Sequence, residues 1–131
     1  MIGIDTNVLL RLWLNDDTAQ NDRLDALLAE HGSAPASLLV TDVVLAQAMW
    51  TLGSAYEQDK AAQRLAVSSL LAEAAFAFED RAAVERALTL FDESSCGFSD
   101  CLIVAKHAHH GCQFTATFDR GMRKLPGVRL V

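Results

Sequence analysis

The sequence has few of the residues that mark specialised classes of protein. Its 131 residues include only 3 Cys, 2 Pro and 7 Gly. So few prolines and glycines exclude a collagen-like or low-complexity chain. The three cysteines lie close together, at 96, 101 and 112, which favours reduced thiols in a cytoplasm over a disulfide framework. No apolar run reaches the roughly 18 residues of a membrane span, and no basic region precedes the first apolar segment, so we expect neither secretion nor membrane insertion.

The sequence also has fewer basic residues than acidic ones. The chain has 11 Lys and Arg against 17 Asp and Glu, a formal net charge of −6. This balance argues against a protein that coats nucleic acid through a basic surface, although it does not exclude an enzyme that cuts nucleic acid. Hydrophobic residues make up 51% of the chain, enough for a sizeable core. Length and composition together predict a single domain over residues 1–131.

Short apolar runs alternate with stretches of helical spacing along the whole chain. We expect strands at 1–5, 37–41, 76–78, 113–118 and 128–131, and helices at about 8–14, 19–30, 43–52, 60–73, 81–92 and 99–110. Asp42 and Asp80 are expected to cap the helices that follow them. Trp13, Trp50 and Phe76 lie in apolar segments and are expected in the core. Buried strands alternating with helices predict an α/β fold around a central parallel sheet covered on both faces.

Three acidic residues lie where such a fold collects its ligands. Asp5 and Asp119 end predicted strands, and Asp100 lies in the first turn of a predicted helix. Carboxylates that converge repel one another, by about 4 kcal/mol for a pair ~4 Å apart at an effective dielectric of 20. A hard cation relieves that repulsion, and Mg²⁺ or Mn²⁺ prefers oxygen ligands of this kind. The pattern therefore favours a metal site that activates water and neutralises charge on a phosphodiester.

Each acid also has a purely structural interpretation. Asp100 can complement a helix dipole, and Asp119 can shape the turn before Gly121. What favours a site is that polar side chains able to orient a ligand or a water accompany all three acids. These neighbours are Thr6, Asn7, Ser99 and Thr117.

Four blocks of the chain resemble the PIN-domain nucleases, and within them the VapC-type toxins. The blocks are Ile4-Asp5-Thr6-Asn7-Val8-Leu9-Leu10, Val44-Leu45-Ala46 to Trp50-Thr51-Leu52, Gly97-Phe98-Ser99-Asp100-Cys101-Leu102-Ile103 and Thr117-Phe118-Asp119-Arg120. They follow the family's order and spacing over nearly the whole chain. The resemblance implies a three-layer α/β/α sandwich, a divalent-metal-dependent endoribonuclease, a cognate antitoxin as inhibitor, and a homodimer.

Carried over by position, the resemblance assigns Asp5, Asp100 and Asp119 to the metal site and Thr117 to a polar residue beside them. The chain departs from the family's pattern at one position, where Gln47 replaces the family's glutamate. A glutamine keeps the shape and one carbonyl oxygen but loses a full negative charge, so it binds a cation less well.

Three interpretations of Gln47 remain open from the sequence. The glutamine is a deliberate substitution that allows a toxic nuclease to be produced, or a natural variation in an enzyme that works with three carboxylates, or the mark of a catalytically silent PIN-fold module that binds RNA or antitoxin without cutting. Our hypothesis is that the fold and an RNA groove survive while turnover is reduced.

A basic run follows the last of the three acids. Arg120, Arg123 and Lys124 come directly after Asp119 and are candidates to hold RNA phosphates, as is Arg11 after the opening motif. The alternative for this run is a solvated turn. The resemblance makes structured RNA such as a transfer RNA a plausible substrate, although no residue is identified that reads a base.

Overall fold

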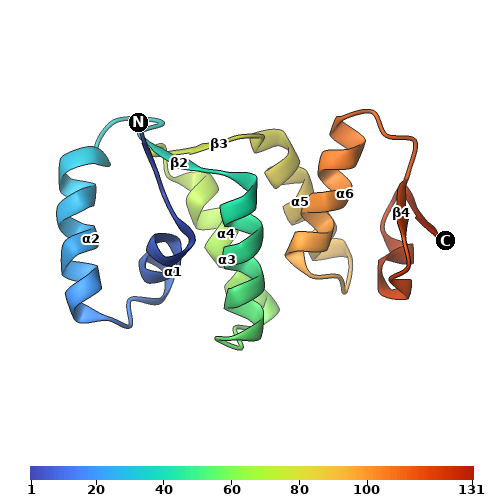
Figure 1. Ribbon diagram of the computed structural model, residues 1–131, viewed down its shortest axis with the longest axis horizontal. Helices are drawn as coiled ribbons and strands as arrows, with labels where there is room; N and C mark the ends of the chain where they lie inside the picture. The colour runs from blue at the N-terminus through green and yellow to red at the C-terminus, as the bar shows by residue number, and fades with distance from the viewer. The chain divides into compact units, whose positions relative to one another are not determined.

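The computed structural model describes all residues from 1 to 131, and they form two compact units, Met1–Glu79 (unit 1) and Asp80–Val131 (unit 2). Unit 1 contains β1 (Ile2–Gly3), α1 (Thr6–Leu14), α2 (Thr18–His31), β2 (Leu38–Val40), α3 (Asp42–Ser54), α4 (Lys60–Ala72) and β3 (Phe76–Phe78). Unit 2 contains α5 (Arg81–Glu93), α6 (Phe98–His109), β4 (Thr115–Thr117), the 3₁₀ helix η1 (Arg120–Lys124) and β5 (Val128–Leu130). Figure 1 labels the α-helices and the strands β2, β3 and β4, and its colours follow the chain from the N-terminus to the C-terminus.

The sheet of unit 1 is parallel, with strand order β1-β2-β3. Ile2 pairs with Leu38, which in turn pairs with Phe76 on the other side. Because all three strands run the same way, their carboxyl ends lie at one edge of the sheet. Asp5 and the start of α3 follow strands that end at this edge.

Side-chain caps set where most of the helices begin. The Asp17, Asp59 and Asp80 carboxylates accept hydrogen bonds from backbone N–H groups in the first turns of α2, α4 and α5. Such bonds satisfy donors that have no partner inside the helix, at about 1 kcal/mol each. Asp80 therefore caps its helix as the sequence predicts.

Two predictions about α3 are wrong. The cap of this helix is Thr41, whose hydroxyl accepts from the N–H of Val44, while Asp42 is the first helical residue and its own N–H donates to Glu79. Trp50 was expected in the core, but it is 68% exposed. The apolar content of this helix is high enough that both faces carry apolar side chains, and only the face with Leu45, Ala48 and Met49 is buried.

The core of unit 1 lies among α1, α3, α4 and β2. Its fully buried side chains include Leu9, Leu38, Leu45, Met49 and Val67. Phe76 and Phe78 on β3 are half-buried, as is Trp13 on α1. Burying each large apolar side chain contributes about 1.5–3 kcal/mol. Together these side chains hold α1 and α3 in place, the helices that begin just after β1 and β2 end.

Unit 2 pairs two helices and two short parallel strands. α5 packs against α6, where the rings of Phe91 and Phe98 meet edge to face with centroids 6.0 Å apart. β4 pairs in parallel with β5, Thr115 opposite Val128. The connection is short for a parallel crossover: η1 takes the place of an α-helix, and Gly127 at φ +71° turns the chain into β5.

The α/β class and the parallel strand pairing are confirmed, and each predicted strand and helix is present. Boundaries differ by a few residues; α6 begins at Phe98, with Gly97 as its cap, where the sequence predicts a start at Ser99. The region predicted as a basic turn after Asp119 is the 3₁₀ helix η1. None of the helices combines the length and the apolar character needed to cross a membrane.

Candidate functional site

Asp5 joins the end of the first strand to the start of α1. It is the N-cap of that helix, and its Oδ1 accepts a hydrogen bond from the backbone N–H of Thr6 at 2.7 Å. No bond uses its second oxygen, and the residue is exposed. Asp5 therefore presents a carboxylate oxygen to solvent at the carboxyl edge of the sheet, held in place by the cap.

Thr6 connects Asp5 to Gln47. Its side chain is buried, with 8% exposed, and its hydroxyl donates to Oε1 of Gln47 at 2.9 Å. Gln47 lies on the exposed face of α3, and its Nε2 has no hydrogen-bond partner. Within unit 1 the structure thus brings Asp5 and Gln47 together, because Thr6 forms a hydrogen bond with each of them.

Asp100 and Asp119 are brought together within unit 2. Asp100 lies in the first turn of α6 and is half-buried. Its pKa is raised above the ordinary value of 3.8, first because burial penalises the charged form and second because the Asp119 carboxylate repels that charge. Two carboxylates whose charges interact in this way form an electrostatically unfavourable pair.

Asp119 is held by its own turn. Its backbone N–H donates to the Thr117 hydroxyl at 3.0 Å, and its Oδ1 accepts from the N–H of Gly121 at 2.8 Å as the cap of η1. The Thr117 hydroxyl also contacts the sulfur of Met122 at 3.7 Å. These contacts fix one carboxylate oxygen of Asp119 and leave the other without a hydrogen bond.

The donor set in unit 2 suits a divalent cation. Asp100 and Asp119 offer only carboxylate oxygens, and a cation between them would remove the repulsion that raises the pKa of Asp100. Within the structure no three His, Cys, Asp or Glu side chains form a group that could hold a metal, so Asp100 and Asp119 are a pair of candidate ligands and not a complete metal site. Asp5, the third predicted ligand, lies in unit 1.

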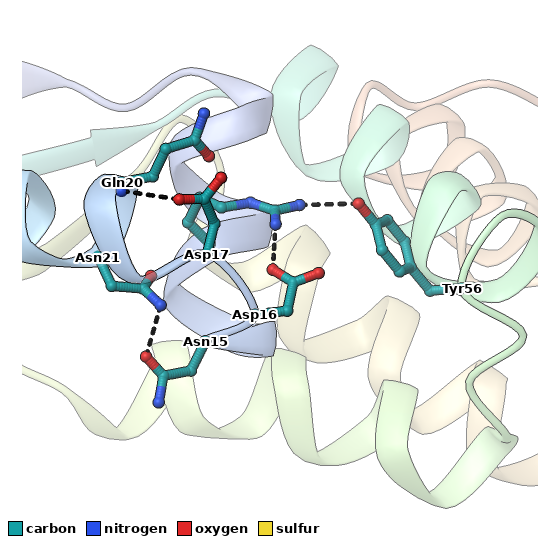
Figure 2. Close-up of polar contacts among 7 residues, drawn as sticks. Asn15, Asp16, Asp17, Gln20, Asn21 and Tyr56 are labelled. Carbon is teal, nitrogen blue, oxygen red and sulfur yellow. Dashed lines mark hydrogen bonds and ion pairs between the residues drawn. The ribbon is translucent and has the colours of Figure 1, made fainter.

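The predicted basic residues differ in their surroundings. Arg120, Arg123 and Lys124 on η1 are exposed and make no ion pair. Arg11 is engaged: its guanidinium donates to the Asp16 carboxylate and to the Tyr56 hydroxyl, the latter at 2.7 Å (Figure 2). Only 14% of the Arg11 side chain is exposed. The hydrogen bond to Tyr56, before that to Asp16, raises the pKa of Arg11.

The remaining polar residues named from the sequence are Asn7 and Ser99. Asn7 is exposed on α1 and lines a hollow of about 310 Å³ between α1 and α2, together with Arg11 and Arg23. Ser99 lies half-buried beside Asp100 at the start of α6.

The structural interpretation of Asp119 is confirmed, because its carboxylate binds the N–H of Gly121 in the turn that the sequence indicates. Sequence reasoning missed one residue that holds a candidate site group. Tyr56 holds Arg11 from 45 residues away, and no local pattern could have indicated that contact.

Comparisons with known proteins place these residues in a family. A family model described as PIN domain matches residues 2–128, which contain all the candidate residues above. A solved toxin–antitoxin complex from Klebsiella pneumoniae contains a chain 19% identical to this one, with a TM-score of 0.37, over 98% of this chain and 96% of that chain. No curated protein matches the chain.

Proposed function

The chain belongs to the PIN domain family, whose members are generally nucleases, and from this premise we propose that it is a divalent-metal-dependent endoribonuclease acting as the toxin of a toxin–antitoxin pair. The observation that carries the proposal is the PIN domain match over residues 2–128, and the electrostatic interaction of the Asp100 and Asp119 carboxylates supports it. A cation bound between two carboxylates would relieve their mutual repulsion.

The proposed ligands of Mg²⁺ or Mn²⁺ are Asp5, Asp100 and Asp119. When bound, such an ion lowers the pKa of a coordinated water and neutralises charge on a phosphodiester. The cap of α1 holds Asp5, and Gly121 with Thr117 holds Asp119, so two ligands are oriented before any ion arrives. Thr6, Asn7 and Ser99 are the further polar residues that orient the ligands and the attacking water.

The chain's cations would bind the RNA backbone. Arg120, Arg123 and Lys124 have no carboxylate partner, so their charges are available to phosphates next to Asp119. Arg11 is the fourth proposed RNA contact, and a phosphate there must compete with Asp16. Guanidinium groups bind phosphate with two parallel hydrogen bonds, which also positions the strand for cleavage.

Gln47 is proposed to reduce the activity. The family's glutamate would add a fourth negative charge beside Asp5, and the amide does not supply it. With one charge fewer the site holds a divalent ion less tightly, so turnover falls at limiting metal.

The proposed partners follow from the resemblance to VapC-type toxins. They are an RNA substrate, with transfer RNA as the leading class, a cognate antitoxin, and a second copy of the chain in a homodimer. The proposed location is the cytoplasm, where these partners would be met.

The test is cleavage of a pool of cellular RNA by the protein and by its Gln47→Glu variant, each with Mg²⁺, with Mn²⁺ and with chelator. We expect metal-dependent cleavage by both proteins, and at limiting metal and saturating RNA a higher rate for Gln47→Glu. Asp100→Asn is the matched control, since it removes a proposed ligand while keeping the shape of the side chain, and it should not cleave. Equal rates for the protein and Gln47→Glu would contradict the role assigned to Gln47.

A second candidate function is a non-catalytic PIN-fold module that binds RNA or antitoxin. The observation in its favour is that Oε1 of Gln47 is taken by the Thr6 hydroxyl, so the position lacks both the charge and a free oxygen. If neither protein cleaves RNA with any metal, this candidate replaces the nuclease.

A further inference from the structure

The amide of Gln47 has a defined orientation at the sheet edge. Its Oε1 accepts the Thr6 hydroxyl at 2.9 Å, and its Nε2 makes no hydrogen bond. Thr6 is buried, so the oxygen faces into unit 1, while the exposed glutamine leaves its nitrogen toward solvent. What this position presents to a ligand is therefore a donor of two hydrogen bonds.

An amide nitrogen has the wrong chemistry for a metal ligand. It carries no lone pair for a hard cation, which takes oxygen ligands instead. It does suit an anionic oxygen, and hydrogen bonds to charged acceptors are stronger than those between neutral groups. A glutamate at this position would bind a cation through its carboxylate oxygens. The glutamine instead offers N–H groups that donate hydrogen bonds to an anionic oxygen.

The place of this donor points to a particular anion. The backbone N–H of Thr6 holds Asp5 at 2.7 Å while its hydroxyl holds Gln47, so a single residue fixes the carboxylate and the amide as neighbours. One carboxylate oxygen of Asp5 and the amide nitrogen of Gln47 make no hydrogen bond, and both side chains are tied to Thr6. A phosphodiester has two non-bridging oxygens, so it could bind a cation through one and accept a hydrogen bond from the amide through the other.

We propose that Gln47 binds substrate rather than metal: its Nε2 donates to a non-bridging oxygen of an RNA phosphodiester, with Thr6 as the positioning residue that keeps the nitrogen outward. This inference rests on the proposed function and deepens it, because it assigns Gln47 to RNA affinity.

The test is binding of a fluorescently labelled single-stranded RNA in chelator, where no cleavage occurs. Gln47→Ala should weaken binding about tenfold, the effect of one hydrogen bond to a charged group. Gln47→Glu should weaken it at least as much, because a carboxylate repels the phosphate. Thr6→Val should give a partial loss that Thr6→Ser restores. Gln113→Ala, at an exposed glutamine in unit 2, is the matched control and should bind as the unaltered protein does.

Mn²⁺ affinity, followed by electron paramagnetic resonance, separates the two roles. Gln47→Ala should bind Mn²⁺ as the unaltered protein does, and Gln47→Glu should bind it more tightly. RNA binding by Gln47→Ala equal to that of the unaltered protein would overturn the inference while leaving the nuclease proposal standing, as would a loss of Mn²⁺ affinity in Gln47→Ala. Absence of cleavage with every metal would overturn the nuclease proposal alone, and absence of RNA binding in chelator by the unaltered protein would overturn the inference alone.

Discussion

The backbone N–H of Gly121 donates to Oδ1 of Asp119 at 2.8 Å, and a Cβ added to Gly121 would lie 3.1 Å from that same oxygen. The contact is tight enough that a side chain at this position would push the carboxylate oxygen away by a few tenths of an ångström. The hydrogen bond from Gly121 at the start of η1 therefore sets the orientation of the Asp119 carboxylate.

Gly121→Ala is expected to lower Mn²⁺ affinity by about tenfold, the low end of the effect of disturbing groups that orient metal ligands. The fold should be kept, because the crowding falls on an exposed carboxylate rather than on the core. Electron paramagnetic resonance of Mn²⁺ measures the affinity, and circular dichroism checks the fold. The control is Gly3→Ala, where an added Cβ meets no atom within 4 Å. Unchanged Mn²⁺ affinity in Gly121→Ala would contradict the positioning role assigned to Gly121.

Asp100→Asn should stabilise the metal-free protein. The pKa of Asp100 is raised above 3.8 by burial and then by Asp119, so the folded state binds this proton more tightly than the unfolded state does. Stability from this group is therefore fully present below pH 3.8 and is lost as the pH rises through the folded-state pKa.

The melting temperature of Asp100→Asn should accordingly exceed that of the unaltered protein at pH 7, and the two should converge under acid conditions. Saturating Mn²⁺ should raise the melting temperature of the unaltered protein and leave that of the variant unchanged. The comparison variant is Asp22→Asn, an exposed aspartate on α2. A variant that melts lower than the unaltered protein at pH 7 would contradict this account of Asp100.

Local chemistry made much of the fold predictable. Asp80 caps α5 because an aspartate just before a run of helical spacing offers the oxygen that the first turn lacks. Asp5 could be placed at a strand end because a short apolar run stops at it. Features of this kind depend only on residues that lie close together in the sequence, so they can be predicted from it.

What could not be predicted depends on contacts far apart in the chain. The bond from Thr6 to Gln47 spans 41 residues, and the bond from Arg11 to Tyr56 spans 45. Trp50 shows a second limit, since α3 is apolar on both faces and its periodicity does not say which face is covered. The sequence therefore named candidate site residues, but it could not indicate that the nitrogen of Gln47, and not its oxygen, is left without a hydrogen bond.

Asp80 predicts a specific dependence of stability on pH. Its pKa lies below 3.8, chiefly because the N–H of Ala83 donates to it and further because Lys106 contacts it at 3.1 Å. A depressed pKa means that the stability is present above pH 3.8 and is lost as the pH falls through the folded-state value.

Asp80→Ala should lower the free energy of unfolding at pH 7 by about 1 to 2 kcal/mol, since it removes a helix cap and an ion pair whose carboxylate is 89% covered. Asp80→Asn, which can still cap, should lose less. Urea unfolding at several pH values measures both, and the differences should shrink as the pH falls below about 4. A constant difference over the whole pH range would show that the ion pair and the charged cap contribute nothing.

The exposed cations of η1 predict how RNA binding depends on salt. Each phosphate neutralised by a Lys or Arg adds about 0.7 to the slope of log affinity against log salt for a single strand. Arg123→Gln and Lys124→Gln should each weaken binding and flatten that slope by about 0.7. Arg86→Gln removes the same charge from an exposed position on α5 and should leave the slope as it is. If all three variants change the slope equally, the effect is that of net charge, and η1 does not contact the RNA.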